Sequence, residues 1–141
     1  MNSEVLKGIY LSNGGRLGRL AYFGYSLALF VAFAIVVSIL TTVLGMVGLV
    51  LSFVLYLGLL YCQYNVAAKR FQDLNKPGQY ALYMMGVAFI AGILTQVAAL
   101  HLIGILLEIL LLVVGLYLLF MPGTAGANNY GAAPTALPGV Q

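Results

Sequence analysis

The chain has 141 residues, of which 63% are hydrophobic and 6% are charged, and its mean hydropathy is +1.07. Too few polar side chains remain to cover a water-soluble globule, so the composition excludes that class and predicts an integral membrane protein. The net charge of +3 comes from six basic residues beside apolar runs, an arrangement that favours membrane topology over nucleic-acid binding.

Residues 1–19 are the first predicted element, a short amphipathic segment that approaches the membrane. Its apolar residues recur at helical spacing: Val5, Leu6, Ile9 and Tyr10. Arg16 and Arg19 follow, three residues apart. We expect them to lie on one side of the next helix and to anchor it at lipid phosphates, because long basic side chains reach the headgroups from an apolar surface.

Four apolar stretches then follow, and none of them contains a lysine or arginine. Their approximate bounds are 20–44, 49–68, 80–98 and 102–121. Each is long enough to cross a hydrocarbon core of about 30 Å at about 1.5 Å per residue. The turn at 45–48 is short, so the first two stretches are predicted to form an antiparallel helical hairpin. The least distinct boundary is the one between the last two stretches, where little interrupts the apolar run.

The loop 69–79 is the one long charged interruption between these stretches. Every lysine and arginine lies either in this loop or in the N-terminal segment. Basic residues beside spanning helices favour the cytoplasmic face, so this distribution predicts an even number of spans with both termini cytoplasmic. Seven tyrosines fall toward the same predicted interface, as expected for rings that rest among headgroups: Tyr22, Tyr25, Tyr61, Tyr64, Tyr80, Tyr83 and Tyr117.

The C-terminal tail, 122–141, is rich in glycine, alanine and proline and carries no charge. Such a segment cannot form a core of its own. Two alternatives follow: the tail is disordered, or Asn128, Asn129 and Tyr130 tie it to the cytoplasmic ends of the helices. We favour partial ordering.

Three separated motifs carry a family resemblance. They lie at 15–22 (GRLGRLAY), at 69–78 (KRFQDLNKPG) and at 122–131 (PGTAGANNYG). In this order around four spans they resemble the DUF805 family of small bacterial inner-membrane proteins, which implies a four-helix membrane protein without an assigned activity. The chain departs from the family pattern at five places: Gln72 replaces a histidine, Asn75 a glycine, Pro77 a serine, Gln79-Tyr80 an aromatic pair and Ala132 a proline.

Glu108 is the only acid within a predicted span. An ionised, unpaired carboxylate in hydrocarbon costs several kcal/mol, so we expect Glu108 to face the bundle or to stay protonated. His101 and Gly104 share roughly its helical face, and Gln96 lies in the same outer layer. One hypothesis is a polar cavity in which Glu108 and His101 exchange protons or bind a cation, and the other is hydrogen bonding between helices. We favour the second.

The cytoplasmic charges form the second candidate site. The predicted lipid-binding or anion-binding residues are Arg16, Arg19, Lys69, Arg70 and Lys76, and the supporting residues are Asp73, Asn128 and Tyr130. Asp73 is expected to pair with Lys69 or Arg70 if the second helix continues past the membrane, or with Lys76 in the turn. Ordinary contact with anionic headgroups is the simpler alternative to a specific ligand.

The sequence offers no constellation for catalysis. Cys62 is the only cysteine, and no nucleophile and base, metal-ligand spacing or nucleotide loop is recognisable, so we expect no enzyme, cofactor or metal. The predicted fold is an all-α membrane protein with four transmembrane helices in two antiparallel hairpins. We favour a non-enzymatic scaffold in a bacterial inner membrane that binds lipid and a second copy or another membrane protein. The alternative is a small transporter or channel that uses Glu108.

Overall fold

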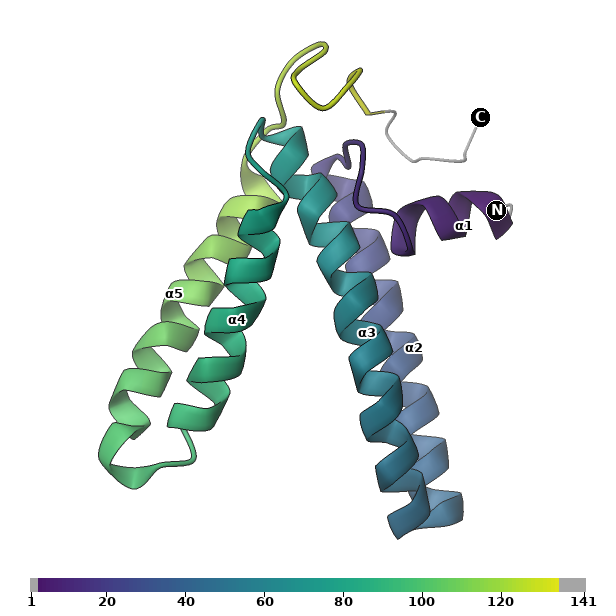
Figure 1. Ribbon diagram of the computed structural model, residues 1–141, viewed down its shortest axis with the longest axis vertical. Helices are drawn as coiled ribbons and strands as arrows, with labels where there is room; N and C mark the ends of the chain where they lie inside the picture. Colours follow the sequence, from purple (N-terminus) through teal and green to yellow (C-terminus); the bar gives the residue numbers. More distant parts are fainter. Residues whose placement is uncertain (1–2, 135–141) are drawn as a thin grey trace.

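The computed structural model describes residues 3–134, and within this range the chain folds into helices without a β-strand (Figure 1). The helices are α1 (Ser3–Tyr10), α2 (Arg19–Leu44), α3 (Met46–Asp73), α4 (Gln79–Leu94), the short 3-10 helix η1 (Ala98–Leu100) and α5 (His101–Phe120). Three helical stretches are long and apolar enough to cross a membrane, namely α2, α3 and Ala98–Phe120, whereas α4 is shorter.

Helices α2 and α3 form an antiparallel hairpin whose turn is a single glycine. Gly45 has a φ of +55°, a conformation that side-chain-bearing residues rarely adopt. Gly48 lies against the backbone of Leu40, where a Cβ atom would collide with the carbonyl group. The hairpin is therefore closed by two glycines, one needed for the turn and one for the close approach of the helices.

Helix α3 continues beyond the expected boundary near residue 68 and ends at Asp73. At about 1.5 Å per residue its 28 residues cover about 42 Å, more than a hydrocarbon core of about 30 Å. Asn75 then adopts a φ of +57°, and Pro77 precedes the start of α4. The charged segment is thus largely the last turn of a helix rather than an extended loop.

Helix α4 is the element that differs most from the sequence prediction. We expected it to reach Ala98, but it ends at Leu94, and η1 follows before α5 begins. The Thr95 hydroxyl donates to the Gly92 carbonyl at 2.9 Å, and His101 Nδ1 lies 2.6 Å from the Thr95 carbonyl oxygen. These polar contacts stabilise the turn in a stretch that contains neither proline nor a charge.

The buried side chains gather at one end of the molecule. Two clusters form there: Ile9, Leu17, Ala21, Tyr25 and Val66 on one side, and Ala67, Ala68, Phe71, Ala81 and Leu118 on the other. From this end the α2–α3 and α4–α5 hairpins diverge, while α1 and the tail lie across it (Figure 1). Most of the remaining helical surface is exposed and apolar. We call the end that holds α1, the 74–78 connection and the tail the cap.

Candidate functional site

Asp73 is the centre of the cap, because its carboxylate pairs with two arginines. Arg16 Nη2 lies 3.0 Å from Oδ1, and Arg70 Nη1 lies 2.5 Å from Oδ2. The three side chains are at most 2% exposed. Arg70 and Asp73 are one turn apart on α3, and the Leu17 amide, which donates to the Lys69 carbonyl at 3.2 Å, brings Arg16 alongside. The cluster is therefore a buried ion triad with one acid between two cations.

The guanidinium groups of Arg16 and Arg70 also donate hydrogen bonds to backbone carbonyls. Arg16 Nη1 donates to Gly126 O at 2.5 Å and Gly131 O at 3.2 Å, and its Nη2 donates to Thr124 O at 2.5 Å. Arg70 donates to Leu118 O at 2.6 Å and Met121 O at 2.5 Å. The last carbonyls of a helix have no partner within it and carry partial negative charge, so Arg70 satisfies the end of α5.

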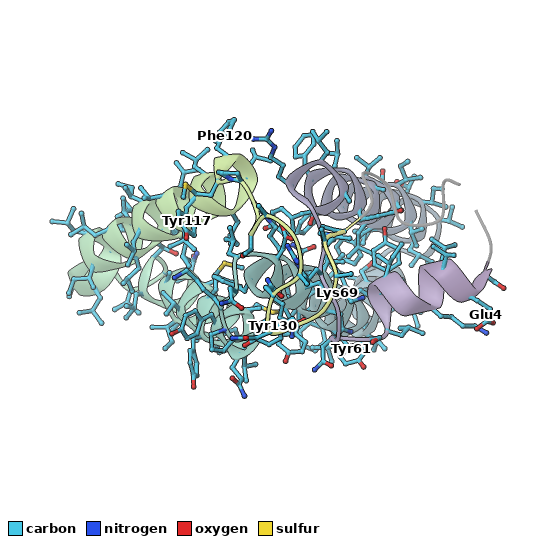
Figure 2. All side chains as sticks on the ribbon, turned by 90° about the horizontal axis from the view of Figure 1, so that it is seen from above. Glu4, Tyr61, Lys69, Tyr117, Phe120 and Tyr130 are labelled. Carbon is cyan, nitrogen blue, oxygen red and sulfur yellow. The ribbon has the colours of Figure 1, made fainter. Side chains whose placement is uncertain are left out.

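The tail is held to α3 at several further points. The Thr124 amide donates to Asp73 O at 2.8 Å, and the Asn128 side chain donates to Gln72 O at 2.8 Å. A Cβ atom at Gly123 would collide with the Asp73 carboxylate, so only glycine fits there. The expected partial ordering of the tail is confirmed for residues 122–134, while 135–141 lie outside the described residues. Figure 2 looks down on the cap, where the tail carrying Tyr130 lies over the end of α3.

Lys69 binds the other end of the cap. Its ammonium group donates to the Gly8 carbonyl and, at 2.8 Å, to the Ile9 carbonyl, while the Asn65 amide donates to Tyr10 O at 2.8 Å. These carbonyls belong to the last turn of α1 and have no partner within that helix, so the Lys69 and Asn65 side chains of α3 supply their hydrogen-bond donors. Burial, followed by the proximity of Tyr25, raises the pKa of Tyr10, whose hydroxyl donates to Tyr25 O at 3.1 Å.

The predicted basic set thus divides into two groups. Arg16, Lys69 and Arg70 are buried and bind protein oxygens, whereas Arg19 is exposed and Lys76 is half-buried. We expected Arg16 to share a helical face with Arg19, and this is wrong, because α2 begins only at Arg19. Of the alternatives for Asp73, the pairing with Arg70 is confirmed. Lipid contact by the exposed cations stays a prediction.

Glu108 is not brought into a polar cluster. It lies on the exposed side of α5, so the expectation that it faces the bundle is wrong for the single chain. Gly104, on the neighbouring turn, packs against Thr95 instead, and Gln96 is exposed in the connection before η1. Within residues 3–134 no group of three His, Cys, Asp or Glu side chains is placed to hold a metal ion.

A polar cavity of about 250 Å³ lies beside the tail, and sequence reasoning missed it. Its lining comes from five separated segments: Asn13, Tyr64, Gln72, Pro77, Gly78, Gln79 and Tyr130. Gln72 Oε1 is buried and has no hydrogen-bond partner among residues 3–134. No local pattern could reveal this cavity, because it forms only where the tail meets α3 and the 74–78 connection.

Comparison with known proteins gives a family and nothing more specific. The model of a family described as "Protein of unknown function (DUF805)" matches residues 10–132. This range includes the Arg16–Asp73–Arg70 triad, the four long helices α2, α3, α4 and α5, and the described tail as far as Ala132. No curated protein and no solved structure matches the chain.

Proposed function

Since the chain belongs to the DUF805 family, whose description assigns no function, we propose from its geometry that it is a non-enzymatic scaffold or partner-binding protein of a bacterial inner membrane. The observation that carries this proposal is the Arg16–Asp73–Arg70 cluster. It uses the buried charges to hold the pre-α2 segment, α3, the end of α5 and the tail in one rigid cap. A rigid surface whose buried charges are held by ion pairs and backbone carbonyls is suited to presenting a fixed shape to a partner.

We place the four long helices across the membrane, with the cap and both termini on the cytoplasmic side. All six lysines and arginines lie in or beside the cap, and none lies near the α2–α3 turn or the α4–α5 connection, in agreement with the positive-inside rule. Helix α4 covers only about 24 Å at about 1.5 Å per residue. Residues 95–100 complete its crossing, with local thinning of the bilayer accommodating the remaining mismatch.

The cations Arg19 and Lys76, which are not buried, contact anionic headgroups in this proposal. Arg19 lies at the first turn of α2, and Lys76 follows the end of α3. Each basic residue near an anionic surface contributes about 1 kcal/mol of attraction. The buried cations contribute little to this contact, because protein oxygens already surround them.

The alternative, a transporter or channel, depends on Glu108. That carboxyl group lines none of the four cavities described for this chain. We therefore expect liposomes containing the parent protein or the Glu108→Gln variant to give the same pH-dependent flux as empty liposomes. A flux that is present in the parent and absent in Glu108→Gln would support transport instead.

Site-specific crosslinking in native membranes tests the scaffold proposal. A photo-crosslinking residue at Asn129, exposed on the cap, should capture a defined protein, either a second copy or another membrane protein. The same residue at Leu57, on the apolar surface of α3, serves as the control. Capture should be lost in Gly123→Ala, which displaces the tail from Asp73, and retained in Gly14→Ala, where a Cβ atom meets nothing within 4 Å. If Gly123→Ala captured the partner as well as the parent does, the proposal would be contradicted.

A further inference from the structure

The two hairpins diverge below the cap (Figure 1). Between them lies a crevice of about 320 Å³. All four long helices line it: Tyr22 and Phe30 from α2, Tyr56, Leu59, Leu60 and Gln63 from α3, Met84, Met85 and Ala88 from α4, and Leu111 and Gly115 from α5. The lining is almost entirely apolar and carries no charge. In a soluble protein such a surface would be covered by further side chains of the chain itself.

Two small residues keep the crevice open. Ala88 and Gly115 contribute little volume from α4 and α5, and a Cβ atom added at Gly115 would meet nothing within 4 Å. An empty apolar void is unfavourable, because its lining loses dispersion contacts. Within a membrane the solvent available to fill it is lipid hydrocarbon, since water gains too few polar partners there.

The cytoplasmic end of the crevice carries a positive charge. Arg19 is exposed at the first turn of α2, and its Nη1 reaches the Phe120 carbonyl at the end of α5 at 3.5 Å. Figure 2 labels Phe120 at the upper edge of the view, beside α5. Tyr22, one turn below Arg19, lines the crevice, so the charge and the apolar lining lie on the same side of α2.

A polar group inside the crevice also lacks a partner. Gln63 donates from Nε2 to the Ser26 hydroxyl at 3.2 Å, but its Oε1 is buried and accepts no hydrogen bond from residues 3–134. A buried acceptor without a donor costs about 1–3 kcal/mol. Gln63 is therefore the one polar side chain of the lining with a buried, unfilled hydrogen-bonding position among the described residues.

We propose that one anionic phospholipid of the cytoplasmic leaflet binds here, with its phosphate at Arg19 and one acyl chain in the crevice. An anionic phospholipid has a negative phosphate next to a hydrocarbon chain. The phosphate would pair with the positive charge of Arg19, and the chain would fill the apolar crevice. This proposal depends on the membrane placement proposed above and specifies the class of lipid that Arg19 contacts.

Retention of lipid during purification tests it. The full chain is reconstituted in vesicles of equal phosphatidylglycerol and phosphatidylcholine, then released into detergent and weighed by native mass spectrometry. We expect one phosphatidylglycerol per chain in the parent. Gly115→Leu fills the crevice and should lose the lipid, whereas Gly58→Leu, an equal change at another open helical glycine, should keep it. Arg19→Gln should remove the preference for phosphatidylglycerol over phosphatidylcholine.

Three results would overturn the proposal. The first is that the parent protein releases all its lipid in detergent. The second is that Gly115→Leu and Gly58→Leu retain the lipid equally. The third is a dimer that only Gly115→Leu disrupts, which would assign the crevice to a second copy. Circular dichroism and thermal unfolding in detergent verify that each variant is folded. Partner capture at Asn129 is a separate measurement. A parent protein that retains no lipid but still captures its partner would therefore contradict the lipid proposal and not the scaffold proposal.

Discussion

Asp73 has an unusual position for a membrane protein's charge, because it is one carboxylate buried between two buried guanidinium groups. Burying charges is costly, and their mutual attraction compensates only when the geometry is good and the remaining donors are satisfied. Here Arg16 and Arg70 complete their hydrogen bonds with backbone carbonyls of α5 and the tail. The triad therefore stabilises the cap as a unit, and its acid is the member whose removal leaves two uncompensated cations.

Asp73→Asn tests this at the residue scale. The variant keeps the shape of the side chain but leaves Arg16 and Arg70 buried without an anion, so we expect the free energy of unfolding to fall by about 3–5 kcal/mol. Denaturant titration in detergent micelles measures the loss. Glu4→Gln is the matched control, because the Glu4–Lys7 pair is exposed and contributes about 0–1 kcal/mol. Equal losses in the two variants would argue against a stabilising role for the triad.

The sequence predicted some of these residues' roles and not others. The Arg70–Asp73 pair follows from helical spacing once α3 extends past the membrane, and that pairing was among the alternatives. The burial of Arg16 could not be predicted, because three of its acceptors are carbonyls more than a hundred residues away in a tail without a helix or a strand. The outward position of Glu108 depends on how α5 turns toward α4, which the all-round apolar composition of α5 does not specify.

At the scale of elements, glycines at close contacts fix how the helices of each hairpin pair. Gly104 on α5 lies against the end of α4, where an added Cβ atom would be 2.7 Å from Thr95 N and 3.0 Å from Ala91 O. Backbone atoms cannot move aside as a flexible side chain can. Helix α4 ends at Leu94, and its C-cap residue Thr95 is the residue that Gly104 contacts. A sequence pattern that contains only apolar residues on both sides of the turn carries no sign of this contact.

Gly104→Ala should therefore separate α4 from α5. Overpacking of this kind costs about 1–3 kcal/mol, and we expect a corresponding decrease in the free energy of unfolding in micelles. Gly92→Ala is the control within the same hairpin, since a Cβ atom there meets nothing within 4 Å. Alanine is the better helix former by about 0.8–1 kcal/mol, so this control should be neutral or stabilising. Destabilisation of both variants to the same extent would contradict the assignment of the contact to Gly104.

The whole molecule places its ion pairs and its two buried clusters at one end, and the opposite ends of the hairpins are largely apolar. The sequence predicted this asymmetry from the positions of the basic residues, and the Arg16–Asp73 contact confirms that the N-terminal segment and the end of α3 lie on the same side. The divergence of the two hairpins could not be predicted, since it depends on which helical faces meet below the cap. Two hairpins joined mainly through the cap require the membrane to cover the rest of their surface.

Labelling single cysteines from outside intact cells tests the four-span arrangement. In a Cys62→Ala background, Met46→Cys at the start of α3, next to the α2–α3 turn, and Ala99→Cys in the α4–α5 connection should react with a membrane-impermeant maleimide. Ala127→Cys in the tail should react only in inverted vesicles, because the cap faces the cytoplasm in our proposal. All three positions are exposed in the chain, so a lack of reaction reports the membrane rather than burial in the protein. The Ala99→Cys variant tests the shortest of the four helices, α4. If Met46→Cys reacts and Ala99→Cys does not, α4 does not carry the chain across the bilayer. The second hairpin is then embedded in one leaflet instead of spanning both.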